Sequence, residues 1–144
     1  MRQREDPIPG NERLFRSVAL RHVDNDRVLD SAVEAPATSF NREKYSQPED
    51  VLSSHRPDDN GIVVMLAGAL PEPLSPTEPG GNVYEFSVAD DPNPPEDPEN
   101  DAHAEVRLAR RGIAYDARHR PGKSARQKAR LALANKLRVL RAPK

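Results

Sequence analysis

The sequence predicts a small α+β domain: a mostly antiparallel sheet of four or five short strands, one short helix and a basic C-terminal helix. Short segments with alternating apolar residues recur between turn-rich stretches, which is typical of half-buried strands. A continuous apolar run at 62–66 is rich in β-branched residues and favours a buried central strand. One longer segment near the C-terminus has apolar residues at helical spacing.

Composition indicates one domain with a thin core. The chain has 144 residues, of which 35% are hydrophobic and 4% aromatic, and its 15 prolines indicate long irregular stretches. We expect three segments. They are a flexible lead-in at 1–12, an α+β domain at 13–108 with Pro-rich acidic loops at 71–82 and 90–101, and a basic connector with an amphipathic C-terminal helix at 109–144.

Five strands and one short helix are expected within the 13–108 domain. Ser46, Gln47, Pro48 and Glu49 resemble a capping box, so a short helix is expected at 46–54 within a partly helical stretch from residue 40. Asp24, Asn25 and Asp26 indicate a turn between the first two strands. The expected strands cover 13–20, 27–33, 62–66, 82–88 and 102–108.

The C-terminal helix is predicted over 124–140. Ser124 and Gln127 form a capping-box pair just after Pro121 and Gly122. One face carries the apolar residues Ala129, Leu133, Leu137 and Leu140. The basic residues around that face are the candidate nucleic-acid contacts Lys123, Arg126, Arg130, Arg138 and Arg141.

Charge is strongly polarised along the chain. Residues 105–144 contain 13 Lys and Arg against two acidic residues, a net charge of +11, whereas residues 1–104 contain 9 against 21, a net charge of −12. Such a basic end favours nucleic acid or an acidic protein surface as partner. Two alternatives need no partner: a solvated amphipathic helix, or a basic helix that neutralises the acidic 90–101 loop. Tyr115 is the one aromatic residue of the basic stretch, so base stacking on single strands has little support.

Several classes of function are excluded or disfavoured. The absence of Cys excludes thiolate catalysis, disulfides and Cys-ligated zinc. The four His residues lack metal-type spacing, and the glycines fit no phosphate-binding loop, so neither metal nor cofactor is expected. No apolar run approaches the ~20 residues of a membrane span, and the charged N-terminus lacks the apolar core of a signal peptide. A cytoplasmic bacterial protein with no membrane contact is expected.

A resemblance covers most of residues 13–140. It rests on a series of short motifs in order: Arg16, Asp30-Ser31-Ala32, Ser39-Phe40-Asn41-Arg42, Ser46-x-Pro48-Glu49, the passage from Asp91-Pro92 through an Asn/Pro loop to His103-Ala104-Glu105-Val106, and the Lys/Arg–Leu-Ala close of the chain. These residues resemble a loose group of small stand-alone bacterial proteins with no assigned reaction, in which an Asn-Pro-x-His loop precedes a short apolar strand. This chain departs from them where Glu99-Asn100-Asp101-Ala102 replaces a tighter Asn-Pro pair. The resemblance implies an order of elements, not a reaction.

Catalytic candidates are few. His103 and Glu105 fall on one face of an expected strand, with Asp101 two residues earlier, where a histidine could shuttle a proton. The alternative is a surface histidine beside acidic residues that has no catalytic role. The order Arg16, Ser31, Glu105 resembles that of ADP-ribosyltransferase-like folds, in which the Arg holds the dinucleotide and the Glu polarises the ribose. We therefore expect a non-enzymatic binding or accessory protein; the alternative is a small enzyme or toxin using Arg16, His103 and Glu105.

Overall fold

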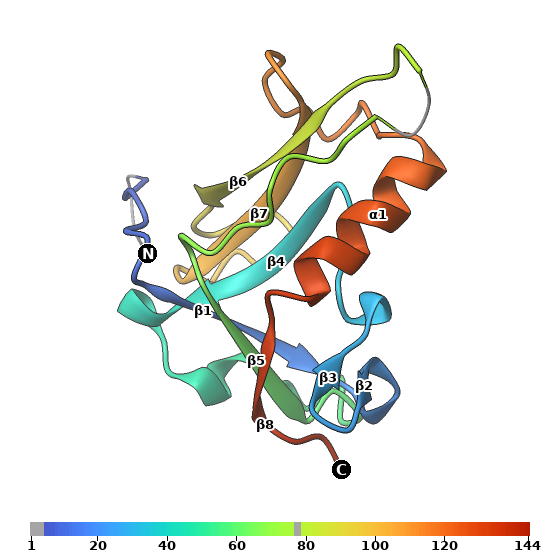
Figure 1. Cartoon of the computed structure of the whole chain (residues 1–144). Helices are drawn as coiled ribbons and strands as arrows, with labels where there is room; N and C mark the ends of the chain where they lie inside the picture. Colours follow the sequence, from blue (N-terminus) through green and yellow to red (C-terminus); the bar gives the residue numbers. More distant parts are fainter. Residues whose placement is uncertain (1–4, 77–78) are drawn as a thin grey trace.

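A six-stranded antiparallel sheet organises the molecule (Figure 1). The computed structural model describes residues 5–76 and 79–144. The strand order across the sheet is β6-β7-β4-β1-β5-β8, and β2 and β3 form a separate hairpin. The strands are β1 (Arg13–Val18), β2 (Val23–Asp24), β3 (Arg27–Val28), β4 (Ala37–Arg42), β5 (Gly61–Leu66), β6 (Tyr84–Asp90), β7 (His103–Arg110) and β8 (Arg138–Arg141).

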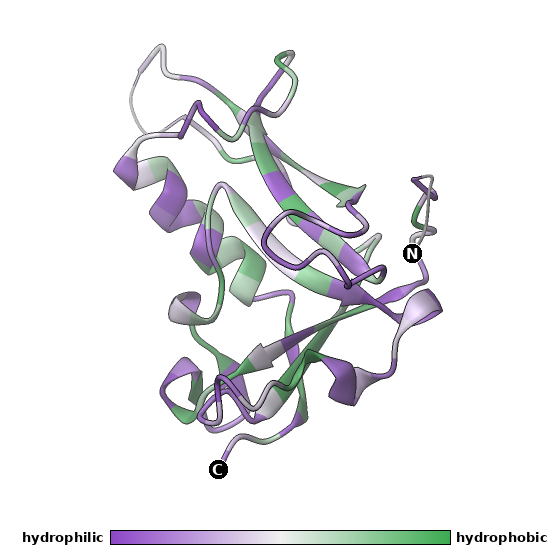
Figure 2. Ribbon diagram, turned by 180° about the vertical axis from the view of Figure 1, so that it is seen from behind, coloured by the Kyte–Doolittle hydropathy of each residue, from purple (hydrophilic) through white to green (hydrophobic). Residues whose placement is uncertain are grey.

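The two faces of the sheet differ in cover. The face packed against α1 (Lys123–Ala134) holds the main core, in which Leu14, Phe40 and Val106 join Leu133 of the helix. On the opposite face a small apolar cluster is covered by the 3₁₀ helix η4 (Pro48–Val51), whose Val51 packs against Phe15. Hydrophilic and hydrophobic bands alternate along the strands in Figure 2, as expected for strands with two unlike faces. The rest of the second face is therefore open to polar side chains.

The C-terminal helix is shorter than predicted. It ends at Ala134, and the chain then forms β8, which pairs with the outer edge of β5. Of the residues predicted on the apolar face, Ala129 and Leu137 are buried. Leu140 is 43% exposed. The extension of the helix over 135–140 was wrong because Arg138-Val139-Leu140-Arg141 also alternates, and pairing with β5 satisfies its backbone groups better than an isolated last turn would.

The sheet also has more strands than the four or five predicted. Two of its strands were not predicted: β8, described above, and β4 at the centre of the sheet, in a stretch where a partly helical segment was predicted from residue 40. Its sequence Ala-Thr-Ser-Phe-Asn-Arg has one large apolar residue, so its pattern does not reveal that Thr38, Asn41 and Arg42 are buried. Within the helix predicted at 46–54 the chain forms the short 3₁₀ helix η4, and a second 3₁₀ helix, η3 (Glu43–Tyr45), precedes it. The second predicted strand shortens to β3, followed by η2 (Asp30–Ala32).

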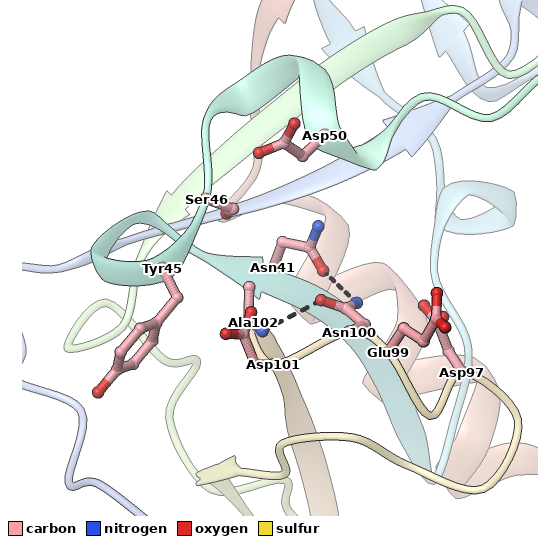
Figure 3. Close-up of a pocket in the computed structure, with 9 residues that line it drawn as sticks. All are labelled: Asn41, Tyr45, Ser46, Asp50, Asp97, Glu99, Asn100, Asp101 and Ala102. Atoms are coloured by element: carbon pink, nitrogen blue, oxygen red, sulfur yellow. Dashed lines mark hydrogen bonds between the residues drawn. The ribbon is translucent and has the colours of Figure 1, made fainter. Parts of the chain in front are cut away.

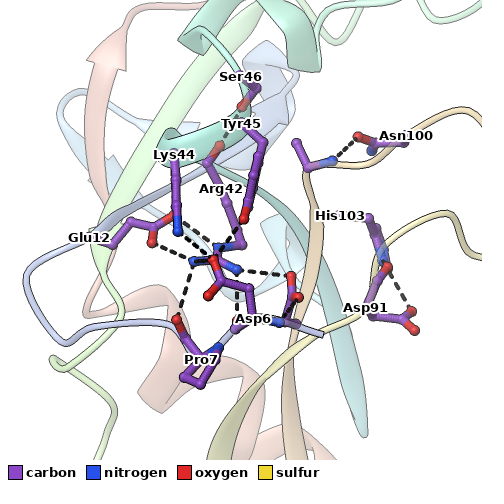
Figure 4. Close-up of polar contacts among 12 residues, drawn as sticks. Asp6, Pro7, Glu12, Arg42, Lys44, Tyr45, Ser46, Asp91, Asn100 and His103 are labelled. Carbon is purple, nitrogen blue, oxygen red and sulfur yellow. Dashed lines mark hydrogen bonds and ion pairs between the residues drawn. The ribbon is translucent and has the colours of Figure 1, made fainter. Parts of the chain in front are cut away.

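The described part of the expected flexible lead-in packs on the sheet. Residues 1–4 lie outside the described residues. The fully buried guanidinium of Arg42 forms ion pairs with Glu12 (2.8 Å) and Asp90 (3.1 Å) and donates to the carbonyl oxygen of Asp6 at 2.8 Å (Figure 4). Lys44 contacts the Asp6 carboxylate at 2.7 Å. Residues 5–12 are thus held against β4 by ion pairs.

Both Pro-rich loops hydrogen bond to the body of the domain. In the 71–82 loop, Leu74 pairs with Tyr84 at the outer edge of β6, and residues 77–78 lie outside the description. In the 90–101 loop, the amide of Asp91 donates to the carbonyl of His103 on β7 at 3.0 Å, and within the loop the amide of Asn93, whose φ is 57°, donates to the carbonyl of Asn100 at 2.8 Å. The second loop thereby folds back over the end of the sheet where β7 begins.

Candidate functional site

Polar side chains gather on the face of the sheet opposite α1, along β4 and β7. Asn41 lies opposite His103 in the strand register, and Ser39 lies opposite Glu105. Residues directly opposite each other in an antiparallel pair point to the same face. The register therefore places these four side chains side by side, although the two strands are about sixty residues apart in the sequence.

His103 is the centre of this group. Its side chain is 5% exposed, with Nε2 3.0 Å from Ser39 Oγ and Nδ1 2.9 Å from the carbonyl oxygen of Asp91 and 3.1 Å from the Asp91 carboxylate. The His103–Asp91 contact can be followed in Figure 4. Because both oxygens facing Nδ1 are acceptors, Nδ1 must carry a hydrogen. In the neutral ring, Nε2 is then an acceptor and the Ser39 hydroxyl donates to it.

The backbone fixes this geometry from the 90–101 loop. The amide of Asp91 donates to the carbonyl oxygen of His103 at 3.0 Å, so the two residues are joined by main chain as well as side chain. Asn100 Nδ2 donates to Asn41 Oδ1 at 2.8 Å and anchors the return of the loop to β4. Asp91 stays 35% exposed in its side chain, so the group is open to solvent on that side.

Glu105 and Arg107 extend the row along β7. Arg107 Nε lies 2.9 Å from Glu105 Oε1, and its guanidinium stacks 4.8 Å from the ring centre of Tyr115. Burial, and then the negative charge of Glu105, raise the pKa of the Tyr115 hydroxyl. Ligand atoms of Asp91, His103 and Glu105 lie within 4.8 Å of one another, so these three side chains could also hold a cation.

A polar hollow of about 300 Å³ lies next to the Asn41 end of this row (Figure 3). It is open, and it separates the segment around η3 and η4 from the 97–102 turn. Four carboxylates line it, so its field favours cations. Its lining residues are Asn41, Tyr45, Ser46, Asp50, Asp97, Glu99, Asn100, Asp101 and Ala102.

The other predicted catalytic residues are not all brought to this row. Arg16 is part of β1, and its guanidinium donates to the carbonyl oxygens of Ala32 (2.8 Å) and of Ser39 on β4 (3.0 Å). Burial lowers the pKa of this guanidinium. Ser31 is exposed on η2, and Asp101 lines the hollow. His103 and Glu105 share one strand face as predicted, but Arg16 and Ser31 do not meet them.

Sequence reasoning missed Ser39 and Asp91 as partners of His103. Ser39 stood just before the stretch expected to be partly helical, outside every predicted strand, and Asp91 stood in a loop expected to be solvated. Their only signal was that each belongs to the short motifs carrying the bacterial resemblance. Neither motif indicates that Ser39 and Asp91 lie on opposite sides of one imidazole ring.

The predicted basic residues form two groups. Lys123, Arg126 and Arg130 follow one another at three- and four-residue spacing on α1, whereas Arg138 and Arg141 lie on β8. Arg138 and Arg141 pair with Val64 and Ile62, which places them toward the face opposite α1. The predicted single basic helix is therefore a helix stripe and a separate pair on an edge strand.

The Lys and Arg residues of this C-terminal region have no acidic partner among the residues that the structure describes. Residues 120–144 contain nine Lys and Arg and no acidic residue, and within 5–76 and 79–144 none of the nine lies within 4.0 Å of a carboxylate oxygen. Among the described residues, Nε of Arg126 and Nε of Arg130 are buried and have no hydrogen-bond acceptor. The acidic loop instead pairs with Arg42 through Asp90 and with His103 through Asp91.

In the described residues no helix has the length and apolar character needed to cross a membrane.

Comparisons with known proteins give no family for this arrangement. No family model, no curated protein and no solved structure matches the chain.

Proposed function

We propose that this chain is a binding protein whose C-terminal basic surface contacts a polyanion, with nucleic acid as the first candidate. The observation that carries the proposal is the set of nine Lys and Arg residues over 120–144, none of which has an acidic partner among the described residues. Lys and Arg side chains that have no such partner are neutralised by small counterions from solution. A phosphate backbone can replace these counterions, and their release drives binding.

The helix stripe is the part of this surface best suited to a phosphate backbone. Lys123, Arg126 and Arg130 lie on α1 within seven residues, a rise of about 10 Å along the helix axis. The apolar side of α1, including Ala129 and Leu133, is buried in the core, so the stripe is held on a rigid element. A rigid row of cations can contact several phosphates without ordering a flexible tail first.

The test is a salt series. Fluorescence anisotropy of a labelled duplex DNA of about 20 base pairs is measured with the full chain between about 50 and 200 mM salt. We expect binding with little sequence preference, weakening as salt rises, with a log–log slope of about −0.9 per phosphate neutralised. No anisotropy change at the lowest salt would overturn nucleic acid as the partner.

An acidic protein surface is the second candidate. Leu131 is 56% exposed on α1, close to Lys128 and Arg130 in the helix. An apolar residue with a charged surround is typical of protein interfaces, whereas a phosphate backbone makes no use of it. Leu131→Ser separates the two, because it should weaken an acidic protein partner and leave the duplex affinity unchanged.

A further inference from the structure

We propose that Ser39 is a nucleophile activated by His103, and that this site hydrolyses carboxylic esters whose alcohol group is neutral or cationic. The site lies on β4 and β7, on the face of the sheet opposite the basic stripe of α1 and several strands away from β8, and it does not depend on the proposed binding function. The basis is one relay of hydrogen bonds from Ser39 through His103 to Asp91.

The relay has the geometry required for an activated hydroxyl. A nucleophile and its base must lie within about 2.6–3.2 Å, with the base oriented by a third group. Ser39 Oγ lies 3.0 Å from His103 Nε2, and Asp91 Oδ2 lies 3.1 Å from Nδ1. The two acceptors of Asp91 fix the hydrogen on Nδ1, which leaves the lone pair of Nε2 facing the hydroxyl.

The main chain supports both ends of the relay. Arg16 Nη1 donates to the carbonyl oxygen of Ser39 at 3.0 Å, in the region where β1 and β4 no longer pair. Arg16 is thus a positioning residue for the nucleophile. At the other end, the amide of Asp91 donates to the carbonyl oxygen of His103. Ser39 itself is half-buried, so the residue is not sealed inside the core.

Charge around the relay defines the class of ester. Asp91 and Glu105 flank His103, and Arg107 is already paired with Glu105. The adjoining hollow adds the carboxylates of Asp50, Asp97, Glu99 and Asp101. This field repels an anionic substrate and attracts a cationic one. The hollow is lined by Asn41, the neighbour of the relay on β4 and β7, and not by Ser39 or His103, so its contribution is to the field that an approaching substrate meets.

The reaction proceeds in two balanced steps. Ser39 Oγ forms a bond to the ester carbonyl carbon while its proton moves to His103 Nε2; the carbon–oxygen bond to the alcohol then breaks and the alcohol leaves with that proton. Water next attacks the acyl group on Ser39 with His103 as base. The carboxylic acid leaves, and the Ser39 hydroxyl and neutral His103 are restored.

The experiment is covalent labelling of the full chain with a fluorophosphonate, followed by intact mass and peptide mapping. We expect one adduct, on Ser39, that is lost in Ser39→Ala and formed at least about a hundredfold more slowly in His103→Gln. Asp91→Asn should slow labelling at least about tenfold. Ser87→Ala is the matched control: Ser87 is exposed on the same face of the sheet, opposite Arg107, and its loss should change nothing.

Two results would overturn the proposal. One is a wild-type chain that gives no adduct on Ser39, or that labels Ser87 as readily. The other is stoichiometric binding of Zn²⁺ or Mn²⁺ in calorimetry that is lost in Glu105→Gln, together with no labelling, which would make the group a cation site. Acetylcholine and its uncharged analogue 3,3-dimethylbutyl acetate test the substrate class, and faster hydrolysis of the cationic ester is expected. Thermal unfolding of each variant verifies that it folds.

Discussion

The guanidinium of Arg42 lies 2.8 Å from Glu12 Oε1, and both side chains are buried. Asp90 completes the buried group at 3.1 Å from Arg42 Nη1. Burial opposes the charge of Arg42, but hydrogen bonds and attraction from Glu12 and Asp90 outweigh it, and the pKa of the guanidinium is raised. One side chain thus joins the N-terminal segment, β4 and the end of β6.

Removing this cation should destabilise the fold strongly. Arg42→Met fills a similar volume but removes the positive charge that pairs with the buried carboxylates of Glu12 and Asp90. We expect a loss of about 3–5 kcal/mol in the free energy of unfolding, measured by urea denaturation. The control is Arg21→Met, the same substitution at an exposed position, which should change the free energy of unfolding by less than about 0.5 kcal/mol. Equal effects of the two variants would contradict the buried network.

The contact of Asp6 with β4 and η3 should depend on pH in the acid range. Hydrogen bonds from Lys44 and then Tyr45 lower the pKa of the Asp6 carboxyl to about 2, from an ordinary 3.8. A depressed pKa means that the stabilisation is present above about pH 4 and is lost as pH falls toward about 2.

Asp6→Asn is the corresponding variant. Thermal midpoints measured from pH 5 to pH 2 should fall more steeply for the wild type than for Asp6→Asn, and the difference between the two should shrink toward pH 2. A constant difference across this range would show that the Asp6 charge does not stabilise the fold.

The leucines of the C-terminal region should separate by burial. Leu133 is buried in the main core and Leu137 packs with it, whereas Leu140 is exposed on β8. Leu133→Ala and Leu137→Ala should each cost about 2–5 kcal/mol of unfolding free energy, and Leu140→Ala less than about 1 kcal/mol. Leu131→Ala, at an exposed position of the same helix, controls for helix propensity. A large cost at Leu140 would mean that β8 packs more deeply than the structure shows.

The two basic groups should contribute separately to binding of the labelled duplex. If the α1 stripe contacts three phosphates, changing Lys123, Arg126 and Arg130 together to Gln should reduce the salt slope by about 2.7. Arg138→Gln with Arg141→Gln on β8 is the comparison elsewhere on the basic surface, and should reduce the slope by less than about 0.9 for each residue changed. An equal reduction of the salt slope per residue in both groups would show that the net charge of the surface, and not the α1 stripe, sets the affinity.

Sequence alone was sufficient where the local pattern and the tertiary environment agree. The apolar run at 62–66 became β5, and the alternation over 102–108 became most of β7. The acidic Pro-rich stretch at 90–101 could form no helix or inner strand, because proline removes donors and blocks helical geometry, and it is a loop. The polarised charge is likewise a property of composition.

Tertiary structure decided the elements whose local signal was ambiguous. Arg138–Arg141 fits a helix or a strand, and the free edge of β5 selects the strand. β4 is a central strand because Arg42 finds buried carboxylates and Thr38 donates to the carbonyl of Glu34, partners that no periodicity reveals. Ser39, Asp91 and His103 meet only because β4 pairs with β7 in one register, and a shift of one residue would turn Ser39 to the other face. Composition determined which chemical groups the chain carries, and strand pairing decided which of them are neighbours.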